Sequence, residues 1–116
     1  MSVTEFELKK RRLLLQLLNK LESELRNQEL WQKNKPSDAD LSSTVPFAID
    51  TLTFVQWLQF IFIDKMGKIL QLSQPLPGAI SVLPMATEQF KNLSVNSAEI
   101  INIIGRIDLL ISENKE

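Results

Sequence analysis

The chain has 116 residues, a net charge of −1 and 44% hydrophobic residues, which is the composition of one ordinary globular domain. It contains no histidine, cysteine or tyrosine, which excludes histidine acid–base chemistry, thiolate nucleophiles, disulfides and thiolate metal sites. The longest nearly apolar run, residues 54–63, is interrupted by glutamines and is shorter than the roughly 18 residues of a membrane span. We therefore expect a single cytoplasmic domain over residues 1–116, with no membrane partner.

The first predicted element is a long helix over residues 4–28. Thr4 can cap it, and the dipole of a helix favours the acidic residues of its first turn. Leucines recur at the spacing of one helix face, at Leu14, Leu18, Leu21 and Leu25. Residues 34–46 have turn composition and predict a long loop, whose two ends pack against the body of the domain.

The second predicted helix spans residues 52–71, with Asp50, Thr51 or Thr53 as its cap. At 100° per residue, one core-facing arc contains Phe54, Val55, Leu58, Phe62, Met66 and Ile69. Phe60 and Ile63 then project to the opposite side, near Gln56 and Gln59. A helix that is apolar nearly all round is central or has a second packing surface.

Prolines separate this helix from the last two. Pro75 and Pro77 exclude a helix over residues 74–78. A short helix is predicted from about Pro84 to Asn92, and another after Asn96 or Ser97, where Asn96 and Glu99 have capping-box spacing. Gly105 inside the last helix suggests a close helix crossing. The predicted fold is all-α, a four-helix bundle-like domain with a long first loop and a Pro-rich connection after the second helix.

No catalytic, cofactor or metal site emerges from the motifs. The three glycines are dispersed, so no phosphate-binding loop is present, and no EF-hand spacing exists. Asp38 and Asp40 are interpreted as solvated turn residues. We expect no cofactor, no metal and no enzymatic activity.

The sharpest charge feature is the basic tetrad Lys9, Lys10, Arg11 and Arg12. Four successive helical residues fan around the helix, and surface pairing with acidic neighbours is the favoured interpretation. The alternative is that these four side chains contact RNA phosphates.

An aromatic and proline group is the second candidate site. It has more apolar surface than loops and helix flanks usually carry, and it forms either core beneath the long loop or an exposed groove for a partner. Its members are Trp31, Phe47, Trp57, Phe60, Ile63, Pro75, Leu76, Pro77 and Gly78.

Residues 30–85 resemble the YqcC-like family of small bacterial proteins. The resemblance is carried by motifs in a fixed order: Trp31, Pro46-Phe47, Asp50-Thr51, Phe54, Trp57-Leu58-Gln59, Met66, Gln74-Pro75-Leu76-Pro77-Gly78 and Pro84. The chain departs at Asp64-Lys65-Met66, where the resemblance predicts a Pro-Arg-Met-like sequence. The resemblance implies a compact all-helical fold and an uncharacterised function. It also implies that family members are often encoded beside a tRNA pseudouridine synthase. That enzyme's own activity does not transfer, because it needs a larger α/β domain with a basic RNA cleft.

Three functional hypotheses follow. The leading one is a non-enzymatic interaction or accessory domain that binds another protein or a second copy of itself. The alternative is an accessory factor that binds tRNA or RNA through the basic tetrad. The third is an enzyme or small-ligand binder with an apolar pocket between the second helix and residues 75–84.

Overall fold

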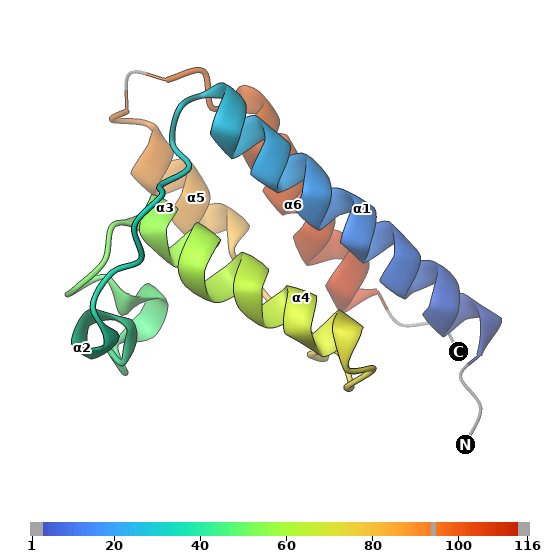
Figure 1. The fold of residues 1–116 in the computed structure, drawn as a ribbon. Helices are drawn as coiled ribbons and strands as arrows, with labels where there is room; N and C mark the ends of the chain where they lie inside the picture. Colours follow the sequence, from blue (N-terminus) through green and yellow to red (C-terminus); the bar gives the residue numbers. More distant parts are fainter. Residues whose placement is uncertain (1–3, 94, 114–116) are drawn as a thin grey trace.

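The computed structural model describes residues 4–93 and 95–113. Within this part of the chain all regular secondary structure is helical, and the elements form a bundle (Figure 1). The first helix, α1, spans Glu5–Asn27. The Thr4 hydroxyl accepts a hydrogen bond from the Glu7 N–H at 3.1 Å, which confirms the predicted cap. The predicted stripe from Leu14 to Leu25 is buried, and Lys10 is buried with it.

The second helix is one continuous rod of three segments, α3 (Phe54–Trp57), η2 (Leu58–Ile63) and α4 (Asp64–Gln71). It begins two residues later than predicted, because Thr53 is the N-cap. The Thr53 hydroxyl accepts from the Gln56 N–H at 3.1 Å, and the Gln56 side chain accepts from the Thr53 N–H at 2.9 Å. This capping box selects Thr53 among the three candidate caps.

The middle segment, η2, is a π-helix, with hydrogen bonds between residues five apart. Residues i and i+5 therefore become neighbours, and Trp57 stacks on Phe62 with ring centroids 5.5 Å apart. The wider turn of the π-helix also places Gln59 on the inward side, where only 7% of this residue is exposed. The prediction that Gln59 lies opposite the core was wrong, because it assumed 100° per residue throughout the helix.

The last two helices, α5 (Leu83–Phe90) and α6 (Ala98–Ser112), are confirmed within one or two residues. The start of α5 is capped from a distance. Asp108 of α6 accepts hydrogen bonds from the N–H groups of Val82 and Leu83 at 2.9 and 2.8 Å. A β-carbon at Gly105 would lie 3.4 Å from a methyl group of Leu83, an ordinary van der Waals contact, so α5 packs against α6 here without requiring a glycine.

The predicted capping box at the start of α6 does not form. Ser97 is the N-cap and makes no side-chain capping bond. The Asn96 side chain instead accepts from the Ala98 N–H at 3.4 Å. Asn96 lies one position too early for the capping-box geometry.

The first and last helices lie antiparallel, and the α3–η2–α4 rod runs beside α1 with α5 behind it (Figure 1). Leucines of α1, isoleucines of α6 and the inward face of the rod share one core. Lys10 locks the α1–α6 pair, because its Nζ donates to the carbonyl oxygens of Ile111 and Glu113 at 3.1 and 2.8 Å. These are carbonyls at the end of α6, where no intrahelical donor is left.

The long connection between α1 and the rod is only partly the predicted loop. It contains a short helix, α2 (Asp38–Leu41), and a 3₁₀ turn, η1 (Pro46–Ala48). Ser37 caps α2 by accepting from the Asp40 N–H at 3.1 Å. Phe47 and Ala48 have positive φ angles of 58° and 48°. Residues other than glycine rarely adopt this backbone conformation without support from surrounding contacts. None of the described helices is long and apolar enough to cross a membrane.

Candidate functional site

The predicted aromatic group divides into two structures, and the first is a cluster within the molecule. The Trp57 ring packs edge-on to Phe47 with centroids 4.8 Å apart and stacks on Phe54 at 5.8 Å. Phe90 of α5 meets Phe54 at 5.8 Å. These contacts explain the unusual backbone at Phe47, since the turn carries its ring into the cluster. Phe47 and Trp57 thus pack against the core, which agrees with the first of the two alternatives for this group.

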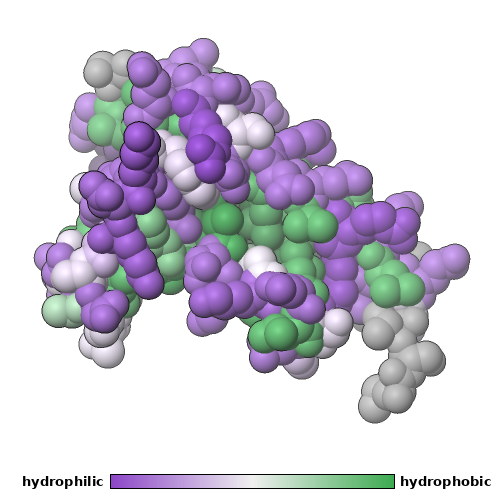
Figure 2. All heavy atoms as spheres, in the orientation of Figure 1, coloured by the Kyte–Doolittle hydropathy of each residue, from purple (hydrophilic) through white to green (hydrophobic). Residues whose placement is uncertain are grey.

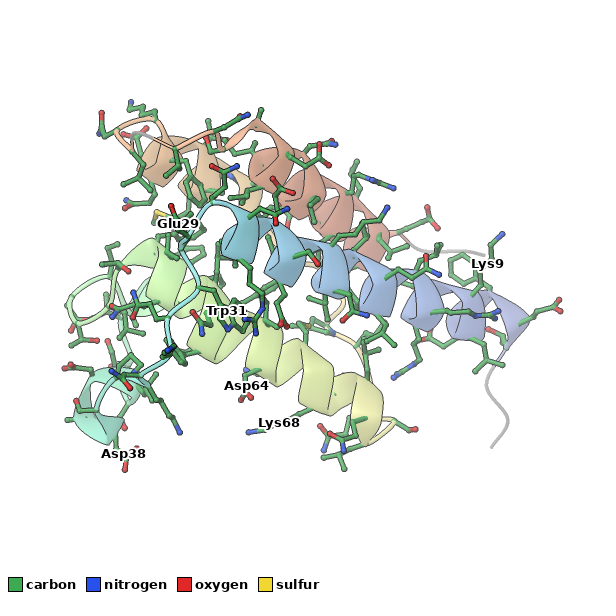
Figure 3. All side chains as sticks on the ribbon, turned by 45° about the horizontal axis from the view of Figure 1, so that its top comes forward. Lys9, Glu29, Trp31, Asp38, Asp64 and Lys68 are labelled. Carbon is green, nitrogen blue, oxygen red and sulfur yellow. The ribbon has the colours of Figure 1, made fainter. Side chains whose placement is uncertain are left out.

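The second structure is built around Trp31, which follows the end of α1. The Gln59 side chain fixes this segment, because its amide accepts from the Gln32 N–H at 2.9 Å and donates to the Gln32 carbonyl at 2.8 Å. On the other side, the Arg26 guanidinium lies 4.7 Å from the centroid of the Trp31 ring. Trp31 lies between α1 and the rod, near Asp64 (Figure 3).

Trp31 forms one wall of a surface groove of about 1180 Å³. The other wall is the outward side of η2 and α4, including Phe60 and Ile63, and Pro75 also lines the groove. Apolar side chains gather between α1 and the rod on this face, with hydrophilic side chains around them (Figure 2). The remaining apolar lining residues are Leu41, Ile61, Ile69 and Leu72. Phe60 and Ile63 are half-buried, and Pro75 lines the groove with them, whereas Trp57 does not.

Charged residues line the groove, and part of them are neutralised locally. Glu22 pairs with Arg26 at 2.9 Å, and Asp64 pairs with Lys68 at 3.0 Å. Lys35 and Lys65 also line the groove. Among the residues described here, neither has a carboxylate within ion-pair distance.

The rest of the Pro-rich segment contributes little to this groove. Leu76 packs against the core, Pro77 is half-buried and Gly78 is exposed, and none of the three lines the groove. The predicted pocket between the second helix and residues 75–84 agrees with this groove only along the second helix and at Pro75. Its helix-two side exists, but the facing wall is Trp31 and Lys35, because the Gln59 contact draws that segment across the rod.

The basic tetrad does not form one surface. Lys10 is buried against the end of α6, and Arg11 pairs with Glu7 at 3.0 Å while also donating to the Gln74 carbonyl. Only Lys9 and Arg12 are exposed. The phosphate-contact interpretation thus loses two of its four side chains to contacts within the protein, and surface pairing describes Arg11 correctly.

The two aspartates of the long loop belong to α2, and the Asp40 carbonyl accepts from the Thr51 hydroxyl at 2.6 Å. Within residues 4–93 and 95–113, no group of three or more acidic side chains is placed to hold a metal ion.

Sequence reasoning missed three kinds of groove residue. Gln59, which positions Trp31, was placed on the side of the helix opposite the core, although a glutamine inside the most apolar run is a signal for a buried polar contact. Lys35 and Lys65 lie in separate elements, and no spacing rule connects them. Leu72 carried the simplest signal, an apolar residue at a helix end, and 63% of it is exposed.

These features define a small all-helical domain with an apolar surface groove and a basic rim. A family described as tRNA pseudouridine synthase C (DUF446) matches residues 13–110, and the chain belongs to this family. The uncharacterized protein YqcC of Escherichia coli is 33% identical over 97 residues, which cover 84% of this chain and 89% of YqcC. This confirms the resemblance drawn from the motifs.

Three further proteins are similar to this chain. The solution NMR structure of E. coli YqcC matches with a TM-score of 0.79 and 29% identity, covering 92% of each chain. A protein of Pectobacterium carotovorum named tRNA pseudouridine synthase C is 36% identical over 62 residues. That match covers 53% of this chain but only 16% of the Pectobacterium protein. An uncharacterized protein of Haemophilus influenzae is 33% identical over 79 residues, 68% of this chain and 74% of its own length.

Proposed function

We propose that this chain is a non-enzymatic protein-interaction domain that acts as an accessory to another protein. The carrying observation is the groove, which is open to solvent and lined by Trp31, Phe60, Ile63 and Leu72. A surface groove that combines apolar side chains with a polar rim is the usual form of a binding site. The carboxylates of the groove lining, Glu22 and Asp64, form ion pairs within the chain. A polar rim around an apolar centre is typical of protein–protein interfaces.

The favoured partner is a tRNA pseudouridine synthase. The support comes from the Pectobacterium protein of that name, in which a segment similar to this chain makes up 16% of the polypeptide. A segment that is joined covalently to a protein in one organism is a natural candidate for binding that protein as a separate chain in another. The proposal concerns association and assigns no pseudouridine synthase activity to this chain.

Binding can be tested by calorimetry. The purified tRNA pseudouridine synthase C of the organism that encodes this chain is titrated into the full chain. We expect saturable binding that Phe60→Ser weakens by about tenfold or more, as for the anchor of an interface. Leu109→Ser is the matched control, because Leu109 is 75% exposed and lies outside the groove. Circular dichroism checks that both variants fold. Absence of binding, or equal loss in both folded variants, contradicts the proposal.

Direct contact with tRNA is the second candidate, favoured by the same synthase name and by the exposed Lys9 and Arg12. It predicts a tRNA mobility shift at about 50 mM salt that weakens steeply as salt increases. Lys9→Ala with Arg12→Ala should then remove the shift. No shift at that salt concentration rules this candidate out.

A further inference from the structure

The charges at the rim of the groove are not balanced. Glu22 and Asp64 are held by Arg26 and Lys68, so the carboxylates of the lining are already neutralised. Lys35, on the segment after α1, and Lys65, on α4, remain as the cations of the lining without a carboxylate partner among the described residues. They come from two different walls. The free charge facing an occupant is therefore positive on both walls.

The walls also restrict the backbone of an occupant. They consist of helices and of the segment that Gln59 already pairs with, and the described residues include no strand edge that could extend into a sheet. A bound segment finds no backbone partner in these walls, and an α-helix satisfies its own N–H and C=O groups. The lining from Phe60 to Leu72 follows one helix for about 18 Å at 1.5 Å per residue, which suits a helix of about three turns.

We propose that this groove receives an amphipathic helical segment of a partner protein whose apolar stripe is flanked on both sides by carboxylates. This inference rests on the proposed interaction function and adds the chemistry of the partner. The apolar stripe packs against Trp31, Phe60 and Leu72. The flanking carboxylates pair with Lys35 on one wall and with Lys65 on the other.

Two synthetic helical peptides of about 15 residues test the inference. Both carry leucines at the i, i+3, i+4 and i+7 spacing of one helix face, flanked by glutamates in the first peptide and by lysines in the second. Titration into the full chain should show the acidic peptide binding at least about tenfold more tightly, since the two rim lysines attract the glutamates of the first peptide and repel the lysines of the second. In a Trp57→Phe background, Trp31 is the remaining tryptophan, and its emission should shift on binding.

Charge reversal provides the decisive variant. Lys35→Glu with Lys65→Glu should abolish the preference for the acidic peptide. Lys9→Glu with Lys20→Glu changes the net charge equally on exposed positions of α1 outside the groove, and should keep the preference. Equal affinities for the two peptides, no binding of either, or equal effects of the two double variants would overturn the inference.

The synthase titration separates this inference from the function on which it rests. If Phe60→Ser weakens synthase binding and the Lys35/Lys65 reversal does not, the interaction function stands and the acidic-helix inference fails. Sedimentation analysis of the free chain tests whether a second copy of this chain occupies the groove. A dimer that Phe60→Ser converts to a monomer would place another copy of this chain in the groove and would also overturn the inference.

Discussion

The side-chain amide of Gln59 hydrogen bonds to both backbone groups of Gln32, accepting from its N–H at 2.9 Å and donating to its carbonyl at 2.8 Å. Gln59 thereby acts as a substitute for a neighbouring peptide unit. It ties the segment after α1 to the π-helical turn of the rod and holds Trp31 at the groove. A groove wall thus depends on one buried polar side chain.

Gln59→Leu is expected to lower the free energy of unfolding by about 1–3 kcal/mol, because it leaves the Gln32 N–H and carbonyl without their partners. The emission of Trp31 should also change as its segment loses its anchor. Gln71→Leu is the control, since Gln71 is exposed at the end of α4 and its replacement should stay within about 0.5 kcal/mol. Urea denaturation measures both. Equal small effects would show that the Gln59–Gln32 contact contributes nothing to stability.

Lys10→Met should cost about 1–3 kcal/mol of stability, because the Lys10 ammonium makes two charge-assisted bonds to carbonyls at the end of α6. Methionine keeps most of the apolar length of the side chain. Lys9→Met removes the same charge from an exposed neighbour and should cost less than about 0.5 kcal/mol. Thermal denaturation of the two variants compares them, and similar melting temperatures would contradict the structural role of Lys10.

Asp108→Ala should cost about 1–3 kcal/mol, since it leaves the first N–H groups of α5 without an acceptor. Asp108→Asn keeps one carbonyl oxygen and should lose less. Hydrogen exchange would localise the effect, with faster exchange at Val82 and Leu83 than in α1. Unchanged exchange at these two amides in Asp108→Ala would show that the carboxylate does not cap α5.

Trp57→Ala should destabilise the protein near the lower end of the roughly 3–5 kcal/mol range of buried aromatic truncations, because Trp57 is only half-buried but contacts three other rings. Trp57→Phe preserves a stacking partner and should lose less. Chemical denaturation measures both variants. A loss below about 1 kcal/mol for Trp57→Ala would place this ring outside the energetic core.

Much of the fold could be predicted from local pattern. The leucine spacing of α1, the Thr4 cap, the proline break after Gln74 and the isoleucine period of α6 each depend on residues within one or two helical turns. The candidate site was predicted only in part. Trp31, Phe60, Ile63 and Pro75 do line one groove, whereas Phe47, Trp57 and Leu76 pack inward.

The sequence by itself determined the helices, because side-chain periodicity, capping and proline sterics act over a few neighbouring residues. Only the tertiary structure decided how those helices use their polar residues. Lys10 meets Ile111 across 101 residues, and Gln59 meets Gln32 across 27. The partner of each polar side chain depends on which backbone groups remain unpaired where two elements pack. Local sequence patterns contain no information about those groups. The π-helical turn in which Gln59 is buried likewise departs from the 100° periodicity that the local pattern assumes.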